Sequence, residues 1–194
     1  MAQYLSQTLL RQLADDVETI RQTAENEFGS LSATELLQRP GPAKWSIAEC
    51  LEHLNTYSRY YLPLIELAIQ HGEQRQLVAT FTFSSSWLGD YFVRMMQPPA
   101  EGKTGSRYKA AKRHLPAPTL NPEAVWIEFI QQQARLGDLL QQAQHVHIGR
   151  LKIAISLSRW IRLSLGDVLR FVVVHEQRHL LQAQRVLHTF DLIQ

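Results

Sequence analysis

Apolar residues recur at helical spacing along four long stretches of the chain. In the first stretch, residues 3–28, one apolar face is formed at spacings of three and four by Leu5, Leu9, Leu13, Val17 and Ile20. This pattern predicts an amphipathic helix that ends near residues 26–29. A loop is predicted over residues 37–45, where proline and glycine interrupt the pattern in "RPGP".

The second stretch, residues 46–72, has a well-marked start. Ser46 followed by Glu49 is a capping box, in which each side chain satisfies a free backbone amide of the first turn. Pro63 lies inside the pattern and predicts a kink, since proline removes a backbone donor. Gly72 is expected to end the helix.

The third and fourth stretches are also helical by pattern. Asn121 is a good cap for a helix over residues 121–144, with Pro122 and Glu123 suited to its first turn. A helix over about 165–189 is predicted with Ser164 as cap and Asp167 three residues later. Four long helices without a convincing set of strands indicate an all-α fold, a four-helix bundle formed by residues 1–194 as a single domain.

Two segments between these helices are harder to assign. Residues 73–120 form a long connection with a short helix predicted over 86–97, ended by Pro98 and Pro99. A connection of this length is typical of a crossover or of a segment that shapes a site. Residues 147–163 carry partial alternation and are expected to be extended or irregular.

Composition narrows the possible classes of function. The 194 residues are 45% hydrophobic and 20% charged, as in globular domains, and the net charge of +2 argues against a nucleic-acid partner. Cys50 is the single cysteine, which excludes an internal disulfide and suits a reducing compartment. No signal peptide and no membrane-spanning run is apparent, so a cytoplasmic location without membrane association is expected.

Histidines provide the candidate chemistry. Along the last helix, one stripe contains Val168, Phe171, Val172, His175, His179, Gln182 and Val186. His175 and His179 are therefore one turn apart on the core face, where two imidazoles can reach one metal ion. Taken alone, this pair is as consistent with packed core histidines as with metal ligands.

A third histidine strengthens the metal interpretation. His53 shares an inward seam of the second helix with Cys50, Tyr57, Tyr60 and Leu64. Three histidines from two helices would leave metal positions open for water or substrate. Glu49, Tyr57 and Gln182 are candidate neighbours that orient ligands or relay protons, although each is more simply explained as an ordinary helix-face residue. A surface location is expected for the other five, His71, His114, His145, His147 and His188.

The segment "HEQRH" also matches the HExxH motif of zinc peptidases. In that class the glutamate is the general base and a third ligand follows downstream. Only 15 residues follow His179, and none is Glu or Cys. Since one helical step rotates a side chain by about 100°, Glu176 is expected at the rim or in solvent, and the peptidase hypothesis ranks last.

The chain resembles the DinB family, which includes YfiT-like metal-dependent hydrolases and bacillithiol transferases. The resemblance rests on "KWSIAECLEHLNTY" (44–57), "HEQRHLLQAQRVL" (175–187) and, more loosely, "AAKRHLPAPT" (110–119). It implies a four-helix bundle with a long crossover, often in a homodimer, and a divalent metal held by His53, His175 and His179. The long segment 73–108 and the apolar, basic segment 147–163 depart from the family pattern.

Two classes of function follow from these patterns. The first is a hydrolase or thiol transferase that acts on a small molecule through the three-histidine site, with Zn²⁺ or Ni²⁺ as the expected ion and a low-molecular-weight thiol as one expected partner. The second is a non-catalytic metal-binding or dimerising bundle. Trp87, Trp126 and Trp160 could belong to a dimer surface, but core packing explains these aromatic residues more simply.

Overall fold

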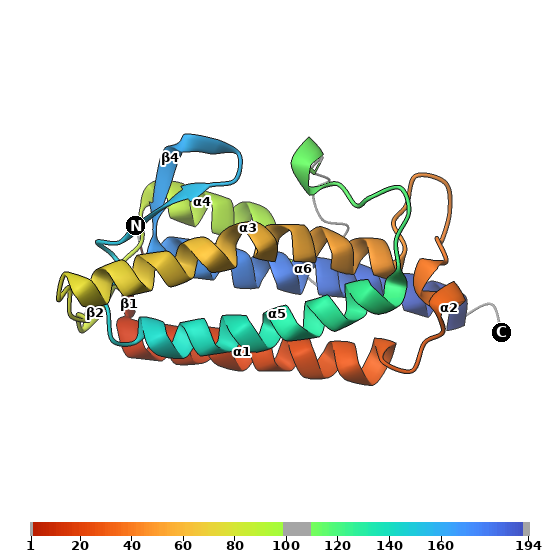
Figure 1. Cartoon of the computed structure of the whole chain (residues 1–194), viewed down its shortest axis with the longest axis horizontal. Coiled ribbons are helices and arrows are strands. Elements are labelled where there is room, and N and C mark those ends of the chain that lie inside the picture. Colours follow the sequence, from red (N-terminus) through yellow and green to blue (C-terminus); the bar gives the residue numbers. More distant parts are fainter. Residues whose placement is uncertain (1, 99–109, 192–194) are drawn as a thin grey trace.

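The computed structural model describes residues 2–98 and 110–191, and its main body is the expected bundle of four long helices. These helices are α1 (Ser6–Phe28), α3 (Ile47–Gln74), α5 (Pro122–Ala143) and α6 (Leu165–Asp191). Each of α5 and α6 packs against both α1 and α3. Figure 1 shows α1 and α6 running in one direction and α3 and α5 in the other, an arrangement that requires long connections between parallel neighbours.

Capping residues fix the starts of three long helices as the sequence predicts. Ser46 Oγ accepts a hydrogen bond from the Glu49 backbone amide at 3.2 Å, and the Glu49 carboxylate accepts one from the Ser46 amide at 2.9 Å. Asn121 caps α5 at 3.2 Å, with Pro122 in the first turn. Ser164 Oγ accepts from the Asp167 amide at the start of α6 at 3.1 Å.

Other helix boundaries differ from prediction for reasons of tertiary packing. Helix α1 begins at Ser6 because strand β1 (Gln3–Leu5) pairs with β2 (Thr82–Ser84). Helix α3 passes Gly72 and ends at Gln74, and a Cβ on Gly72 would lie 2.9 Å from Leu151 Cδ1. That glycine therefore permits close packing rather than ending the helix. A short helix α2 (Ala33–Leu37), capped by Ser32, was not predicted.

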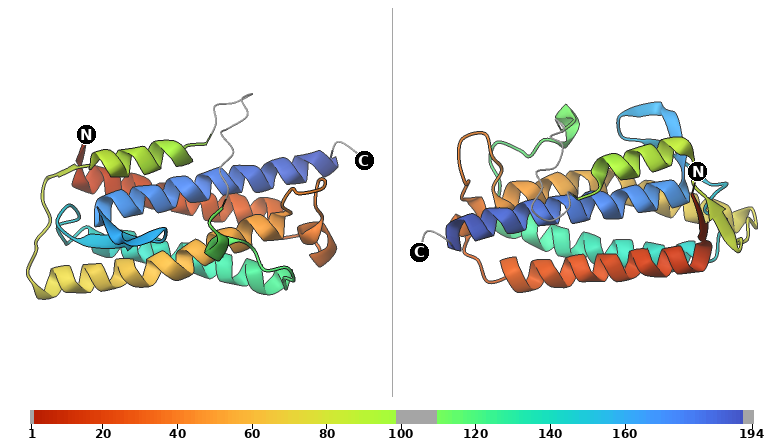
Figure 2. Two further views of the ribbon diagram at one scale, coloured as in Figure 1. Left: turned by 90° about the horizontal axis from the view of Figure 1, so that it is seen from above. Right: turned by 180° about the vertical axis from the view of Figure 1, so that it is seen from behind.

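The two accessory segments lie on one face of the bundle. Strands β3 (Lys152–Ile155) and β4 (Ser158–Ser164) form an antiparallel hairpin, so the extended alternative for 147–163 is confirmed. The crossover carries α4 (Trp87–Met96) and the 3-10 turn η1 (Lys112–His114). Figures 1 and 2 place α4, η1 and the hairpin over α3 and α6. The predicted helix end at Pro99 lies outside the described residues.

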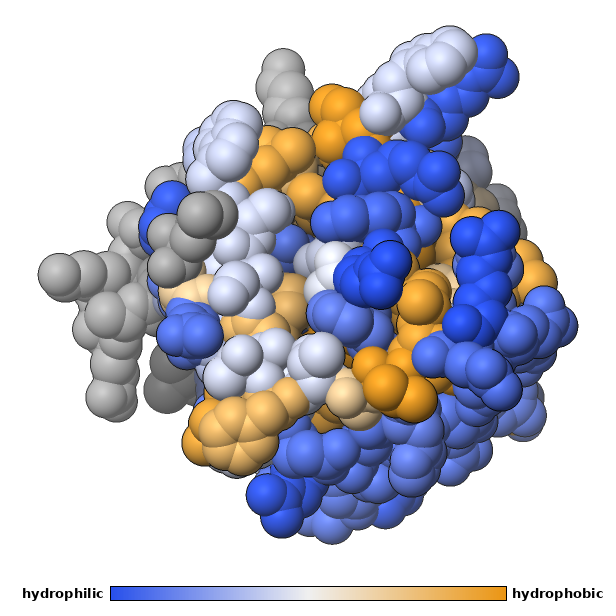
Figure 3. Space-filling view, turned by 90° about the vertical axis from the view of Figure 1, so that its left-hand side faces the viewer, coloured by the Kyte–Doolittle hydropathy of each residue, from blue (hydrophilic) through white to orange (hydrophobic). Residues whose placement is uncertain are grey.

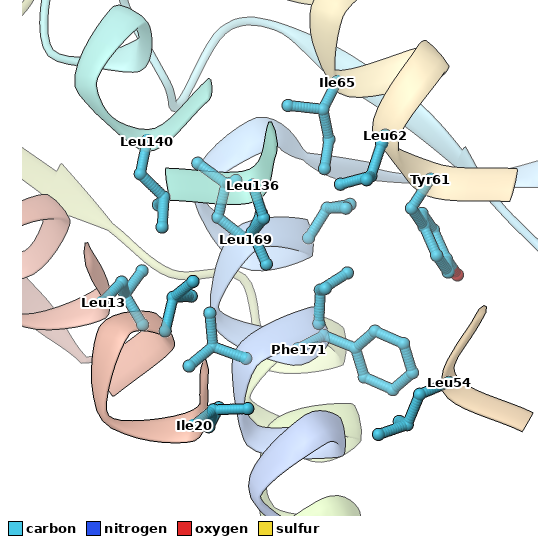
Figure 4. Close-up of a cluster of buried hydrophobic side chains, with 14 of the residues drawn as sticks. Leu13, Ile20, Leu54, Tyr61, Leu62, Ile65, Leu136, Leu140, Leu169 and Phe171 are labelled. Atoms are coloured by element: carbon cyan, nitrogen blue, oxygen red, sulfur yellow. The ribbon is translucent and has the colours of Figure 1, made fainter. Parts of the chain in front are cut away.

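All four long helices contribute to the apolar core. Figure 4 shows side chains that converge on the bundle axis. Those buried there include Leu13 and Ile20 from α1, Leu54, Leu62 and Ile65 from α3, Leu136 and Leu140 from α5, and Leu169 from α6. This continuous core holds α3 and α6 at a fixed spacing, which positions any side chains that face each other across their groove.

The surface contradicts one expectation about the tryptophans. Trp87 is 69% exposed and Trp160 is 81% exposed, so core packing does not explain them, whereas Trp126 is partly buried. Figure 3 shows a mixed surface at the end of the bundle near β2, with hydrophobic patches interrupted by hydrophilic residues. Within the described residues, no helix is long and apolar enough to cross a membrane.

Candidate metal centre

His53, His175 and His179 come together where α3 and α6 pack side by side. His53 lies in the second turn of α3, and the other two lie on successive turns of α6. One ring nitrogen from each histidine lies within 4.8 Å of the others, and His53 Nε2 is 3.3 Å from His175 Nε2. The structure thus brings together the three residues that the helical pattern selected from distant parts of the chain.

Burial keeps these three imidazoles uncharged. Loss of hydration lowers the pKa of His53 to about 4, against a smaller opposing effect of its hydrogen bond to a backbone carbonyl. Burial also lowers the pKa of His179 to about 3, with His53 contributing repulsion. The pKa of His175 is well below its ordinary value, first because of burial and then because of its two histidine neighbours. Neutral imidazole is the form that binds metal.

Two hydrogen bonds orient the rings. His53 Nδ1 donates to the backbone carbonyl oxygen of His114 at 2.6 Å, which leaves Nε2 as the lone-pair nitrogen facing the cluster. His179 Nδ1 lies 3.0 Å from Gln182 Oε1 and donates to it. Partners of this kind fix the tautomer and the direction of metal-binding histidines.

This donor set fits a divalent transition-metal ion. Two nitrogens bound to the same zinc ion, each at about 2.0–2.1 Å, lie about 3.3–3.4 Å apart in tetrahedral geometry. The His53–His175 separation of 3.3 Å matches that spacing. Three neutral imidazoles with no carboxylate suit Zn, Ni, Cu or Fe and disfavour Mg and Ca.

Aromatic rings surround the three histidines. The ring centroid of Trp45 lies 4.9 Å from that of His53 and 5.9 Å from that of His179. Tyr57 lies 4.2 Å from His175. Phe171 stacks on His175 at 5.6 Å with an interplanar angle of 12°. These rings exclude water from most of the cluster, which is the reason that the histidine pKa values are low.

His114 is buried, so the expectation that it lies on the surface is wrong. Its ring stacks on Tyr57 at 3.9 Å, and its Nδ1 lies 3.0 Å from Thr56 Oγ1. The flanking Lys112 and Arg113 suggest a solvated loop, and no periodicity marks a single turn of 3-10 helix. Only the tertiary structure, in which η1 packs against α3, shows that the His114 carbonyl accepts a hydrogen bond from His53.

Glu49 has partners of its own, away from the cluster. Its carboxylate accepts hydrogen bonds from the Ser46 amide and from the Arg39 guanidinium. Burial alone would raise the pKa of Glu49, but these hydrogen bonds together lower it below the ordinary value. Of the three predicted neighbours, Tyr57 and Gln182 touch the histidine rings, and Glu49 serves the start of α3.

Glu176 is fully enclosed, which contradicts its predicted position at the rim. Its carboxyl group lies near Gln133 of α5, and burial raises its pKa to about 8 despite that neighbour. Neither carboxyl oxygen has a hydrogen-bond partner among the described residues. A side chain one residue from His175 turns inward because α6 is covered by α1, α3 and α4, so it has little solvent-facing surface there.

Comparison with known proteins agrees with this architecture. The family model of the DinB superfamily matches residues 16–183. The chain belongs to the DinB superfamily. A search among curated proteins found no match.

Among solved structures, this DinB superfamily chain is similar to YfiT from Bacillus subtilis, described as a probable metal-dependent hydrolase with an unusual four-helix bundle topology. The two share 11% sequence identity with a TM-score of 0.56, over 94% of this chain and 87% of YfiT. At this identity the similarity establishes the fold, and it confirms the predicted bundle with long connections.

In this DinB superfamily chain, the histidine cluster faces outward from the bundle axis. Glu176 and Gln133 meet near the axis, whereas His53 contacts η1 on the face that also carries α4 and the hairpin. His179 is the member of the cluster with partial exposure.

Proposed function

We propose that this chain is a metal-dependent enzyme that acts on a small molecule at His53, His175 and His179, as a hydrolase or a thiol transferase. The observation that carries the proposal is the convergence of three neutral imidazole nitrogens within 4.8 Å, with aromatic rings packed around them. We propose Zn²⁺ or Ni²⁺ as the ion. A divalent ion at this position would supply Lewis-acid chemistry that activates water or a thiol.

The residues of the chain have separable roles in this proposal. The His114 carbonyl and the Gln182 side chain each accept a hydrogen bond from a ring Nδ1, which would leave Nε2 of His53 and of His179 free to bind the ion. Trp45 and Tyr57 exclude bulk water, which strengthens electrostatic interactions inside the site. Three protein ligands leave positions for water and substrate, as in catalytic rather than structural zinc sites.

Support for the two reaction types comes from different sources. The description of YfiT as a probable metal-dependent hydrolase favours hydrolysis. The resemblance to bacillithiol transferases favours transfer to a thiol. Both reactions use the same ligands and differ only in the nucleophile, so a panel of thiols and electrophiles, tested with and without thiol, distinguishes them.

The alternative is a bundle that binds metal or dimerises without catalysis. This alternative is supported by the exposure of Trp87 and Trp160 on the accessory segments. Tryptophan is enriched at protein–protein interfaces. We also propose the homodimer that the family resemblance implies. Analytical ultracentrifugation of the purified protein tests this oligomeric state. A zinc peptidase ranks last because Glu176 is enclosed beside Gln133, where it has no route to a peptide bond.

Elemental analysis of purified protein tests the metal site directly. We expect near-stoichiometric Zn or Ni in the wild type and little in His53→Ala. His71→Ala is the matched control, because His71 lies on the same helix but is exposed. Equal metal content in the wild type and His53→Ala would remove His53 from the site and, with it, the proposed mechanism.

A further inference from the structure

Next to the histidines, α3 and α6 form two walls of a slot with a mostly apolar lining. On α3, one-turn steps lead from His53 to Tyr57 and Tyr61, and on α6 they lead from His175 to Phe171 and Val168. Tyr57 and Phe171 line the slot and also pack against His175. The slot and the candidate metal centre therefore share two walls.

The two segments that depart from the family pattern close the slot. Helix α4 contributes Phe92, Met95 and Met96, and the hairpin contributes Ile155 and Leu163. The hairpin is anchored to α3, because the Ser156 amide donates to Tyr61 Oη at 3.1 Å, and Tyr60 Oη donates to the Ile155 carbonyl at 3.2 Å. Its position over the slot is thus fixed by hydrogen bonds.

The dimensions of the slot limit what enters it. Its volume is about 40 Å³. Since one water-sized group needs about 10–15 Å³ by this measure, the slot admits about three such groups, the size of a propyl chain. Met95 and Met96 have flexible side chains that adapt to the shape of an apolar occupant.

A larger, positively charged cavity adjoins the slot. It has a volume of about 420 Å³ and shares Ser156 and Leu157 with the slot. Its other side is formed by η1 and the residue before it, with Lys112 and Arg113. Neither cation forms an ion pair with any residue in the described ranges 2–98 and 110–191, so both are available to a ligand.

We propose that the substrate is a small anion with a short alkyl group, the alkyl group occupying the slot and the anionic group lying against Lys112 and Arg113. This inference deepens the proposed function, since it names the substrate class of the same site. It rests on the shared walls Tyr57 and Phe171, on the apolar lining of the slot, and on two cations at the adjoining cavity that form no ion pair within the described residues.

Ligand-observed NMR titration with acetate, propionate, butyrate, pentanoate and hexanoate tests the proposal. Metal-free protein is used first, so that a carboxylate cannot bind through the ion. We expect affinity to rise about threefold to fourfold for each methylene that enters the slot and to level off once it is full. Hexanamide, which has a similar chain without the charge, should bind at least about fivefold more weakly than hexanoate.

Matched variants locate the binding. Phe92→Ala should weaken hexanoate binding about fivefold or more, whereas Tyr91→Ala, its exposed neighbour on α4, should not. The double variant Lys112→Gln/Arg113→Gln should remove the preference for hexanoate over hexanamide. Lys152→Gln, an exposed cation on β3, should preserve that preference.

The possible outcomes separate this inference from the proposed function. Affinity independent of chain length, or equal weakening by Phe92→Ala and Tyr91→Ala, would overturn the apolar slot. Equal binding of hexanamide and hexanoate would overturn the anionic requirement. If chain-length-dependent binding occurs in a protein that takes up no metal, the slot stands and the proposed metal-dependent function fails.

Discussion

Among individual residues, Glu49 shows how neighbours decide the role of a side chain. Its position one turn before His53 suggests a role at the metal centre. Its carboxylate instead accepts hydrogen bonds from the Ser46 amide and from Arg39. The capping function is visible in the sequence because it depends on residues three apart. The pairing with Arg39 is not visible, because it depends on how the loop before α3 folds back.

Glu49→Gln should therefore reduce stability without reducing metal content. We expect a loss of about 1–2 kcal/mol at pH 7, from a weakened cap and a lost ion pair to a half-exposed arginine. The folded-state pKa of Glu49 lies below its ordinary value of 4.5, so its stabilisation is present above pH 4.5. The difference from wild type should narrow as pH falls below that value.

Urea denaturation at pH 7 and pH 3.5 measures this difference. Glu66→Gln is the control on the same helix, since Glu66 pairs with Arg135 at the surface and should contribute under about 0.5 kcal/mol. If Glu49→Gln instead lost bound metal while its stability stayed unchanged, Glu49 would have a role at the metal site.

Glu176 gives the opposite expectation, because its carboxyl group is buried without compensation. Glu176→Gln should raise the free energy of unfolding at pH 7 by on the order of 1–3 kcal/mol. With a folded-state pKa of about 8, the ionised carboxylate of the unfolded chain must take up a proton on folding, whereas an amide needs none. Metal content and any turnover should persist. Glu73→Gln, at the exposed end of α3, is the control and should change stability by less than about 0.5 kcal/mol. A zinc peptidase would instead lose nearly all activity in Glu176→Gln.

At the level of secondary-structure elements, sequence predicts what is local. Ser46, Asn121 and Ser164 mark helix starts correctly because capping depends on residues within one turn. The alternation over 147–163 indicated an extended segment, but its strand partner could not be assigned without the turn at 156–157. Gly72 was misassigned because the contact that requires a glycine there comes from Leu151, far along the chain.

The histidine site was predictable for a similar reason, and only in part. His175 and His179 share a helix face, and His53 occupies an inward seam, so periodicity alone selects all three. Trp45 and His114 contact the site from loops, where no periodic signal exists. Site residues that come from irregular segments can therefore be identified only from the tertiary structure.

Helix α4 is held in place by a buried polar contact that Gly89 permits. The Asp167 carboxylate accepts hydrogen bonds from Ser86 Oγ at 2.9 Å and Ser164 Oγ at 2.8 Å, and a Cβ on Gly89 would lie 2.2 Å from its Cγ. Gly89→Ala should therefore displace α4 from α6 and cost about 2–4 kcal/mol.

The matched control is Gly137→Ala on α5, where an added Cβ would meet nothing within 4 Å. Because alanine favours helix, this variant should be neutral or more stable by up to about 1 kcal/mol. Thermal denaturation compares the two variants. If Gly89→Ala proves as stable as Gly137→Ala, then α4 does not depend on its contact with Asp167.

Considered as a whole molecule, the chain brings together histidines from two helices that are far apart in sequence. His53 lies in α3, and His175 and His179 lie in α6, so an ion bound by all three links the second and last long helices of the bundle. The unfolded chain has no such preformed site. Metal binding at this site would therefore contribute directly to the stability of the fold.

Removal of metal should lower the melting temperature, and its return should restore it. At a free-metal concentration of about 100 times Kd, the stabilisation is about 2.7 kcal/mol, which corresponds to about 5–10 °C for a domain of this size. Differential scanning calorimetry on metal-loaded and chelator-treated protein measures the shift. His53→Ala should melt at one temperature with or without metal, whereas His71→Ala should respond as the wild type does. A shift of equal size in His53→Ala would mean that the stabilising ion binds elsewhere, because the three imidazoles of α3 and α6 can act together only when His53 is present.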